Sequence, residues 1–229
     1  LLDSKIHRPN SGDMLIEYND YTNTFFSILQ GTVNVKVKPD DLEPSLELGI
    51  GKFFGEMSLI SGRRRSATVT AGSDCVVIET PRRSMNKLIN SAESVKRTID
   101  EEFMIRAIKM HLAPEVPEES LAEIVRSATL KTFDPNQVLF EEGEQGDSLY
   151  LIRSGSVTVS KSIGDKNTTL AYLPAGNYVG EMALMTDMPR SATVKAAVTT
   201  EAIVLEGSQF RGLLSKNPET KKQLEELIK

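Results

Sequence analysis

The chain has 229 residues, of which 39% are hydrophobic and 26% are charged, a composition typical of globular proteins. Its formal net charge of −5 argues against a nucleic-acid-binding surface, which would need a basic excess. Because the sequence has neither an apolar run of about 18 residues nor a charged-then-apolar opening segment, we expect no transmembrane helix and no signal peptide. The single cysteine, Cys75, cannot form an internal disulfide, so we expect a cytoplasmic protein in which Cys75 is a buried core thiol.

The first part of the chain has the pattern of short β-strands separated by turns. Valines alternate with polar residues over 33–37, a period of two that indicates a half-buried strand. Gly31 and a polar turn at Asn19 and Asp20 separate the runs, and residues 39–44 read as a polar loop. Short strands at this regular spacing predict a sandwich or a β-roll. Further strand signals lie at residues 14–16, 25–29, 46–48, 67–70 and 76–78.

Three helices are predicted next, in the segment from Pro81 to Ser127. The first has Thr80 as its N-cap and Pro81 at its first helical position. The second runs from Ala92 to Leu112, with apolar residues mostly three and four apart, and the third, at about 118–127, begins with acidic residues. The apolar faces of the three helices consist of Met85, Leu88 and Ile89; of Val95, Ile99, Phe103, Ala107 and Ile108; and of Leu121, Ile124 and Val125.

After these helices the strand pattern restarts. Residues 138–140 and 149–152 repeat 14–16 and 25–28 at an offset of 124, and the offset becomes 125 further on. This long-period duplication predicts a mainly β fold with helices, made of two tandem β-rolls in residues 1–112 and 113–229. The first copy has no upstream helix equivalent to 118–127, so we expect the chain to begin inside a larger protein. We also expect Gly31 to correspond to Gly155, and Val76-Val77-Ile78 to correspond to Ile203-Val204-Leu205. A helix capped by Ser208 is expected next, running through Leu213 and Leu214. Pro218 should open a last helix that contains Leu224 and Ile228.

One motif occurs in both copies. Each copy contains the sequence Gly-Glu-Met, and in each an arginine follows the glutamate by nine residues. A structural ion pair would account for a single glutamate and arginine at this spacing, but the whole motif, twice and among β-roll strands, favours a binding site. The copies read Phe54-Gly55-Glu56-Met57-Ser58-Leu59 with Arg65-Ser66-Ala67-Thr68-Val69, and Val179-Gly180-Glu181-Met182-Ala183-Leu184 with Arg190-Ser191-Ala192-Thr193-Val194.

The residue types of this motif suit a ligand that carries a phosphate and a sugar. Glycine lets the backbone approach a ligand closely, and the residues after the Gly-Glu pair can form a helical turn whose free N–H groups face an anion. Arginine supplies a permanently charged planar fork for phosphate oxygens. The carboxylate would be repelled by phosphate, so it suits a sugar hydroxyl instead. Together these groups indicate a nucleotide.

Both copies resemble the phosphate-binding cassette of cyclic nucleotide-binding domains, whose pattern is roughly Phe-Gly-Glu-Leu-Ala-Leu, a short spacer, and Pro-Arg-Ala-Ala-Thr-Val. The resemblance covers nearly the whole chain and implies an eight-stranded β-roll with a helical lid. It implies that Glu56 and Glu181 bind the ribose 2′-hydroxyl and that Arg65 and Arg190 bind the cyclic phosphate. The expected binding residues are Gly55, Glu56, Met57, Ser58, Arg65, Ser66, Ala67, Gly180, Glu181, Met182, Ala183, Arg190, Ser191 and Ala192.

The two copies depart from the family pattern to different extents. Arg64 stands where the family usually has the proline that is kept as Pro189, so the second site matches better. Asn19 replaces a glycine kept as Gly143, a mild change because asparagine tolerates a left-handed turn. Ser66 and its counterpart stand where kinase regulatory subunits have alanine, which leaves base selectivity open; we favour cyclic AMP (cAMP) over cyclic GMP (cGMP).

The tandem layout is similar to regulatory subunits of cAMP-dependent protein kinase and to the sensor half of cGMP-dependent kinase. We therefore expect a non-enzymatic regulatory module, in which ligand binding repacks helices to control a partner such as a kinase catalytic subunit or an attached effector. No metal, nucleic acid or membrane partner is expected. The alternative is an interaction scaffold that keeps the fold without binding ligand. A metal-dependent β-barrel enzyme is disfavoured, because His7 and His111 are the only histidines.

Overall fold

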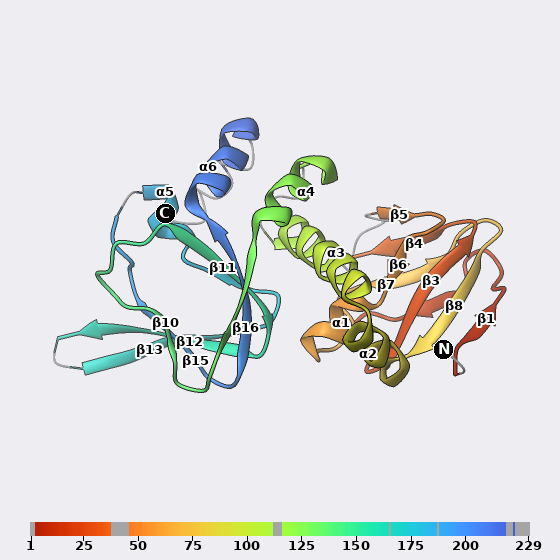
Figure 1. The fold of residues 1–229 in the computed structure, drawn as a ribbon, viewed down its shortest axis with the longest axis horizontal. Coiled ribbons are helices and arrows are strands. Elements are labelled where there is room, and N and C mark those ends of the chain that lie inside the picture. Colours follow the sequence, from red (N-terminus) through yellow and green to blue (C-terminus); the bar gives the residue numbers. More distant parts are fainter. Residues whose placement is uncertain are drawn as a thin grey trace. The chain divides into compact units, whose positions relative to one another are not determined.

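A computed structural model describes residues 3–37, 46–111, 116–164, 166–186, 188–218 and 222 (Figure 1). The chain divides into two compact units, Leu1–Asp100 and Glu101–Lys229. This division falls inside helix α3 (Glu93–His111), and the domain boundary expected at 112/113 stays a prediction. Within the described residues, no helix combines the length and hydrophobicity needed to cross a membrane.

The described strands of the first unit form two four-stranded antiparallel sheets, in the orders β1-β8-β3-β6 and β2-β7-β4-β5. Both sheets contribute to one core, so that Val33 and Val35 of β4 are buried, as their alternation predicts. Cys75 belongs to the same core and is 3% exposed, which confirms the buried thiol. The strands are β1 (Lys5–His7), β2 (Met14–Ile16), β3 (Thr24–Gln30), β4 (Val33–Lys36), β5 (Leu46–Leu48), β6 (Phe53–Phe54), β7 (Thr68–Ala71) and β8 (Val76–Pro81).

Three helices accompany these strands: α1 (Glu56–Ser61), α2 (Arg82–Ser91) and the first part of α3. The expected start of α2 is wrong by one position, because Pro81 is the N-cap and Thr80 belongs to β8. Thr80 pairs with Phe25 of β3, so sheet pairing prevails over its capping preference. The apolar face of α2 packs in a second cluster that contains Phe25, Leu59, Met85 and Ile99.

The second unit repeats this topology in the orders β14-β11-β16-β9 and β10-β15-β12-β13. Each strand of the first unit has a counterpart with the same neighbours, which confirms the predicted pair of β-rolls (Figure 1). The strands are β9 (Thr129–Phe133), β10 (Val138–Phe140), β11 (Ser148–Ser154), β12 (Ser156–Ile163), β13 (Lys166–Pro174), β14 (Tyr178–Val179), β15 (Thr193–Ala196) and β16 (Thr200–Glu206).

The expected correspondence between positions of β8 and positions of β16 is wrong by two residues. Phe26 of β3 pairs with Glu79, and its counterpart Tyr150 of β11 pairs with Val204. The position equivalent to Val76 is therefore residue 201 and not Ile203. An unbroken apolar run does not show which residues face the core, so the sequence alone leaves its register open.

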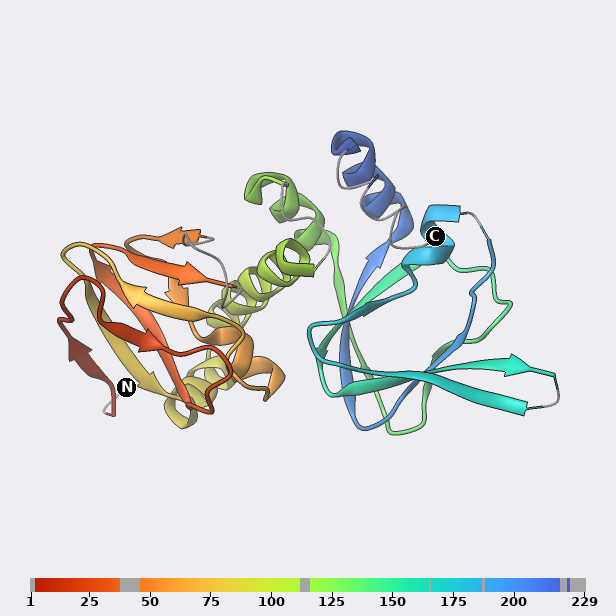
Figure 2. The ribbon, with the colours of Figure 1, turned by 180° about the vertical axis from the view of Figure 1, so that it is seen from behind.

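The helices of the second unit are α4 (Glu118–Ser127), α5 (Glu181–Thr186) and α6 (Gly207–Lys216). Seen from behind in Figure 2, α6 continues directly from the end of β16. Its N-cap is Glu206 and not the expected Ser208, because Glu206 and Gln209 form a reciprocal capping box. The loop expected at 39–44, the end of the second helix at Leu112, and Leu224 and Ile228 of the last helix lie outside the described residues.

Candidate functional site

A left-handed glycine precedes the short helix of each cassette. The φ angles of Gly55 and Gly180 are 90° and 97°, a region that side chains rarely occupy. A Cβ atom on Gly55 would lie 2.8 Å from Nη1 of Arg65, and one on Gly180 would lie 2.5 Å from Nη1 of Arg190. Glycine therefore serves both the turn and the close approach of the arginine to the backbone.

The glutamates are the first residues of α1 and α5, which are both six residues long. Glu56 is only 1% exposed, and Glu181 is half-buried. Burial raises the pKa of Glu181 above its ordinary value of 4.5, although Arg190 and nearby backbone N–H groups act in the opposite direction. Ionised Glu181 thus carries a desolvation penalty in the folded protein.

We expect Glu181→Gln to stabilise the ligand-free protein at neutral pH and to weaken binding of a sugar hydroxyl. Because the folded pKa of Glu181 is raised, its contribution to stability is greatest below pH 4.5 and is lost as pH rises through the folded pKa. The free energy of unfolding of variant and parent should therefore coincide near about pH 4 and diverge in the variant's favour by about pH 7. Urea denaturation at both pH values measures this, and a variant less stable than its parent at neutral pH would contradict it.

Arg65 is 3% exposed, and every nitrogen of its guanidinium has an acceptor within the protein. Nε donates to Thr22 Oγ1 at 2.7 Å. Nη1 donates to the Gly55 carbonyl at 3.1 Å and to Ser58 Oγ at 2.8 Å, and Nη2 donates to the Thr24 carbonyl at 2.6 Å. These bonds hold the guanidinium beside the start of α1.

Arg190 is 4% exposed and is held by fewer groups. Nη1 donates to the Gly180 carbonyl at 2.8 Å, and Nη2 donates to the Ser148 carbonyl at 2.7 Å. The guanidinium carbon lies 4.2 Å from the centre of the Phe140 ring. Nε is buried and has no hydrogen-bond partner among the described residues. Burial lowers the pKa of this guanidinium and of its counterpart, and both stay charged at neutral pH.

A tight turn fixes the backbone of each arginine. The N–H of Asn19 donates to the Arg65 carbonyl at 2.9 Å, and the N–H of Arg65 donates to the Asp20 carbonyl at 3.0 Å. The N–H of Gly143 donates to the Arg190 carbonyl at 2.9 Å in the same way. Asn19 has a φ of 65° and Gly143 a φ of 84°, so asparagine does adopt the left-handed turn that its replacement of glycine requires.

The remaining predicted residues belong to the two short helices or follow the arginines in sequence. Ser191 Oγ lies 3.5 Å from Met182 Sδ, and Ala192 is buried. Met57 and Ala183 belong to α1 and α5, and Ser66 and Ala67 follow Arg65. Arg64, at the family's proline position, donates to the Asn19 carbonyl at 3.0 Å.

Sequence reasoning missed the residues that hold the arginines. Thr22, Thr24, Ser148 and Phe140 contact a guanidinium but lie far from it in sequence. The available signal was the duplication itself, since 24 and 148 are equivalent positions that both carry a hydroxyl.

The helix that follows the first roll is tied to the cassette. Arg82, the first residue of α2, donates from Nη2 to the carbonyl of Leu59 in α1 at 3.0 Å, and its N–H donates to the Asn23 carbonyl at 2.8 Å. In the second unit, Arg211 of α6 forms a 2.8 Å ion pair with Asp147. Arg82 therefore links α2 to α1 of the first cassette, whereas Arg211 links α6 to the residue that precedes β11.

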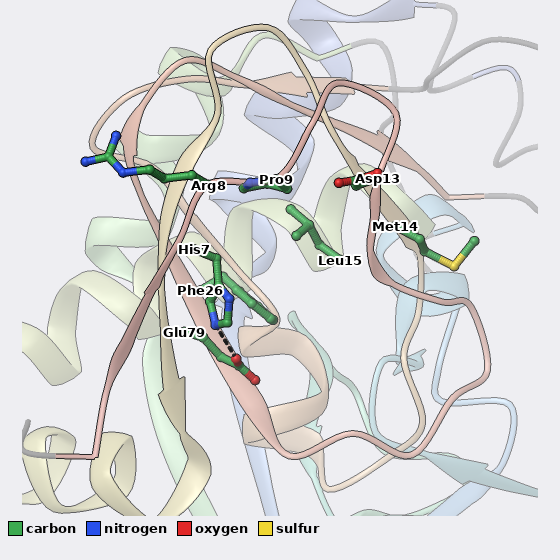
Figure 3. A pocket seen from close by; sticks show the side chains of 8 residues that line it. All are labelled: His7, Arg8, Pro9, Asp13, Met14, Leu15, Phe26 and Glu79. Carbon is green, nitrogen blue, oxygen red and sulfur yellow. Dashed lines mark hydrogen bonds and ion pairs between the residues drawn. The ribbon is translucent and has the colours of Figure 1, made fainter.

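A separate hollow of about 560 Å³ lies elsewhere in the first unit (Figure 3). His7 Nε2 and Glu79 Oε2 are joined by a 2.7 Å hydrogen bond in its wall. Its lining contains none of the predicted site residues. It consists of His7, Arg8, Pro9, Asp13, Met14, Leu15, Phe26 and Glu79. In the part of the chain that the structure describes, no group of three or more histidine, cysteine or acidic residues could hold a metal ion.

Comparison with known proteins agrees with this arrangement. A cyclic nucleotide-binding domain model matches residues 7–92 and 130–217. The cAMP-dependent protein kinase regulatory subunit of Debaryomyces hansenii is 32% identical over 208 residues, covering 89% of this chain and 44% of the relative. That of Dictyostelium discoideum is 29% identical over 226 residues, covering 93% of this chain and 68% of the relative.

Among solved structures, the regulatory domain of Toxoplasma gondii PKA with cAMP has a TM-score of 0.54 and 23% sequence identity. It matches over 99% of this chain and 86% of that one, which supports the fold. The chain spans less than half the length of the Debaryomyces relative. With matches in both halves, the chain belongs to the cyclic nucleotide-binding domain family.

Proposed function

We propose that the chain is a non-catalytic sensor module with two cyclic nucleotide sites, one in each cassette. The observation that supports this most is the repeated arrangement of a buried arginine against the left-handed glycine that opens a short helix. A structural ion pair between glutamate and arginine would not require a left-handed glycine, because such a pair can form without one.

The roles of the groups follow from their chemistry. Arg65 and Arg190 bind the cyclic phosphate, together with backbone N–H groups around 57–58 and 182–183. Glu56 and Glu181 accept a hydrogen bond from the ribose 2′-hydroxyl. The names of the Debaryomyces and Dictyostelium relatives favour cAMP as the ligand over cGMP.

The same names favour a kinase catalytic subunit as the controlled partner. In this proposal the ligand draws the cassette inward, and the bond from Arg82 to the Leu59 carbonyl carries that movement to α2. Moving such a switch decisively requires a state preference of about 5.5 kcal/mol, which two sites can share.

Calorimetric titration with cAMP and with cGMP tests the ligand. We expect saturable heat with both nucleotides and tighter binding of cAMP. If the folded protein gives no heat at millimolar concentrations of either, the sensor proposal is wrong and the alternative, a ligand-independent interaction scaffold, is favoured.

A further inference from the structure

The hollow in the first roll has a carboxylate on the inward face of its sheet. Glu79 of β8 pairs with Phe26 of β3, and both line the hollow. Val77, two residues before Glu79 in the same strand, is fully buried in the core, so Glu79 also belongs to the inward face. A charged side chain on such a face is unusual, because burial of a charge is unfavourable unless it has a partner.

The second roll shows that the fold does not require this carboxylate. Phe26 pairs with Glu79 as Tyr150 pairs with Val204, so valine stands at the equivalent position. Val204 is buried in the core of the second roll together with Tyr150. The carboxylate is therefore a feature of the first roll alone, and its stability in the fold does not explain it.

Aromatic side chains fill the second roll at the corresponding end. The ring centre of Tyr150 lies 6.3 Å from that of Phe133 and 5.6 Å from that of Phe140. At the offset of 124, the first roll has the smaller residues Pro9 and Ile16 in place of these two phenylalanines, and the pairing of β2 and β10 shows the same correspondence. The first roll thus keeps a hollow of about 560 Å³, a volume within the range of small-molecule sites.

The charged groups that face this hollow are hydrogen-bond acceptors. Glu79 Oε2 is bonded to His7 Nε2 at 2.7 Å, and since a carboxylate has about four lone-pair positions, Glu79 can accept from a ligand as well. Asp13 Oδ2 accepts from the N–H of Asn10 at 2.8 Å and is the second carboxylate of the lining. The side chain of Arg8 extends away from the other side chains shown in Figure 3.

These surroundings determine the ligand chemistry. Lys5 lies opposite Glu79 in the β1–β8 pair, but it is exposed and does not belong to the lining. Leu15 and Phe26 add apolar surface beside the carboxylates. An organic amine matches both properties, because its ammonium group donates to carboxylates and its apolar body is removed from water.

We propose that the hollow is a further binding site, separate from both cassettes, for a small organic amine. The ammonium group donates to Glu79, with Asp13 as the second acceptor. The apolar part of the ligand lies against Leu15 and Phe26. This site does not depend on the proposed cyclic nucleotide function, since its lining contains none of the cassette residues.

Benzylammonium is the probe for this site, in an NMR titration of the nucleotide-free chain at about pH 8, where histidine side chains are ordinarily neutral. We expect saturable shifts of backbone amides in β1, β2 and β8. Benzyl alcohol, which has the same shape without the charge, should bind at least about tenfold more weakly. Benzoate should not bind, because the two carboxylates repel it.

Four variants locate the probe. Glu79→Gln keeps the size of the side chain and an acceptor for His7 but removes the charge, so it should weaken binding by about tenfold. Asp13→Asn should weaken it by about threefold. Pro9→Phe introduces the residue of the second roll and should abolish binding by filling the hollow. Glu47→Gln is the matched control and should change nothing, since Glu47 is exposed on β5 and outside the lining.

Three results would overturn the inference: no saturable shifts with benzylammonium in the folded chain, equal binding of benzoate, or an affinity that Glu79→Gln leaves unchanged. If Glu79→Gln does not fold, Asp13→Asn decides by the same criterion. None of these results touches the proposed function, which calorimetry with cyclic nucleotides tests separately. Failure of both nucleotides to bind would in turn leave the amine site standing.

Discussion

Arg190→Lys is expected to weaken cyclic nucleotide binding at the second site by roughly tenfold or more, and Arg65→Lys to do the same at the first. Each buried arginine donates from two nitrogens to backbone carbonyls, and the proposed function requires N–H groups of the same planar fork to bind phosphate oxygens as well. A lysine ammonium is a single point charge, so it cannot hold these carbonyls and bind two phosphate oxygens at once. Titration calorimetry on each variant measures the loss.

Arg126→Lys in α4 is the control for the second unit, since it makes the same chemical change on an exposed residue. It should leave both affinities unchanged. If Arg190→Lys bound cAMP at both sites as the parent does, the second cassette would not be a phosphate site.

Gly180→Ala is expected to destabilise the second unit by about 1–3 kcal/mol and to weaken its site. The φ of 97° is strained for alanine, and the added Cβ would lie 2.5 Å from Arg190 Nη1 and 2.8 Å from the Ser148 carbonyl. Arg190 must then shift from the position in which we propose that it binds the ligand. Urea denaturation and calorimetry measure the two effects.

Gly143 provides matched controls, because it has a φ of 84° but no atom within 4 Å of an added Cβ. Gly143→Ala should show only the backbone strain, about 1 kcal/mol. Gly143→Asn should cost less, since Asn19 adopts this conformation in the first unit. A Gly180→Ala protein no less stable than Gly143→Ala would show that crowding at residue 180 is unimportant.

The sequence predicts the duplication, the two β-rolls and most helix positions, because these depend on local periodicity and on the repeat. Val33 and Val35 are buried as their alternation requires, and α4 has the predicted bounds. The predicted helix cap at Thr80 and the predicted alignment of β16 with β8 were wrong, because pairing with β3 and with β11 decides these positions. The conformational preference of a residue does not show which strand will pair with its own.

The predicted site is incomplete for the same reason. Glycine, glutamate and arginine lie within one short stretch of sequence, so their spacing is readable. Thr22 and Phe140, which contact the guanidinium groups, reach them only through the folding of the sheets. The burial of Arg190 Nε, without a hydrogen-bond partner among the described residues, is visible only in three dimensions.

Equilibrium dialysis against labelled cAMP is the most direct test of the two-site account. At saturation the account predicts two nucleotides bound per chain. When either Arg65 or Arg190 is replaced by lysine, only one nucleotide per chain should bind at the concentrations that saturate the parent. A folded chain that binds no cAMP, or one whose binding is unaffected by both substitutions, would contradict it.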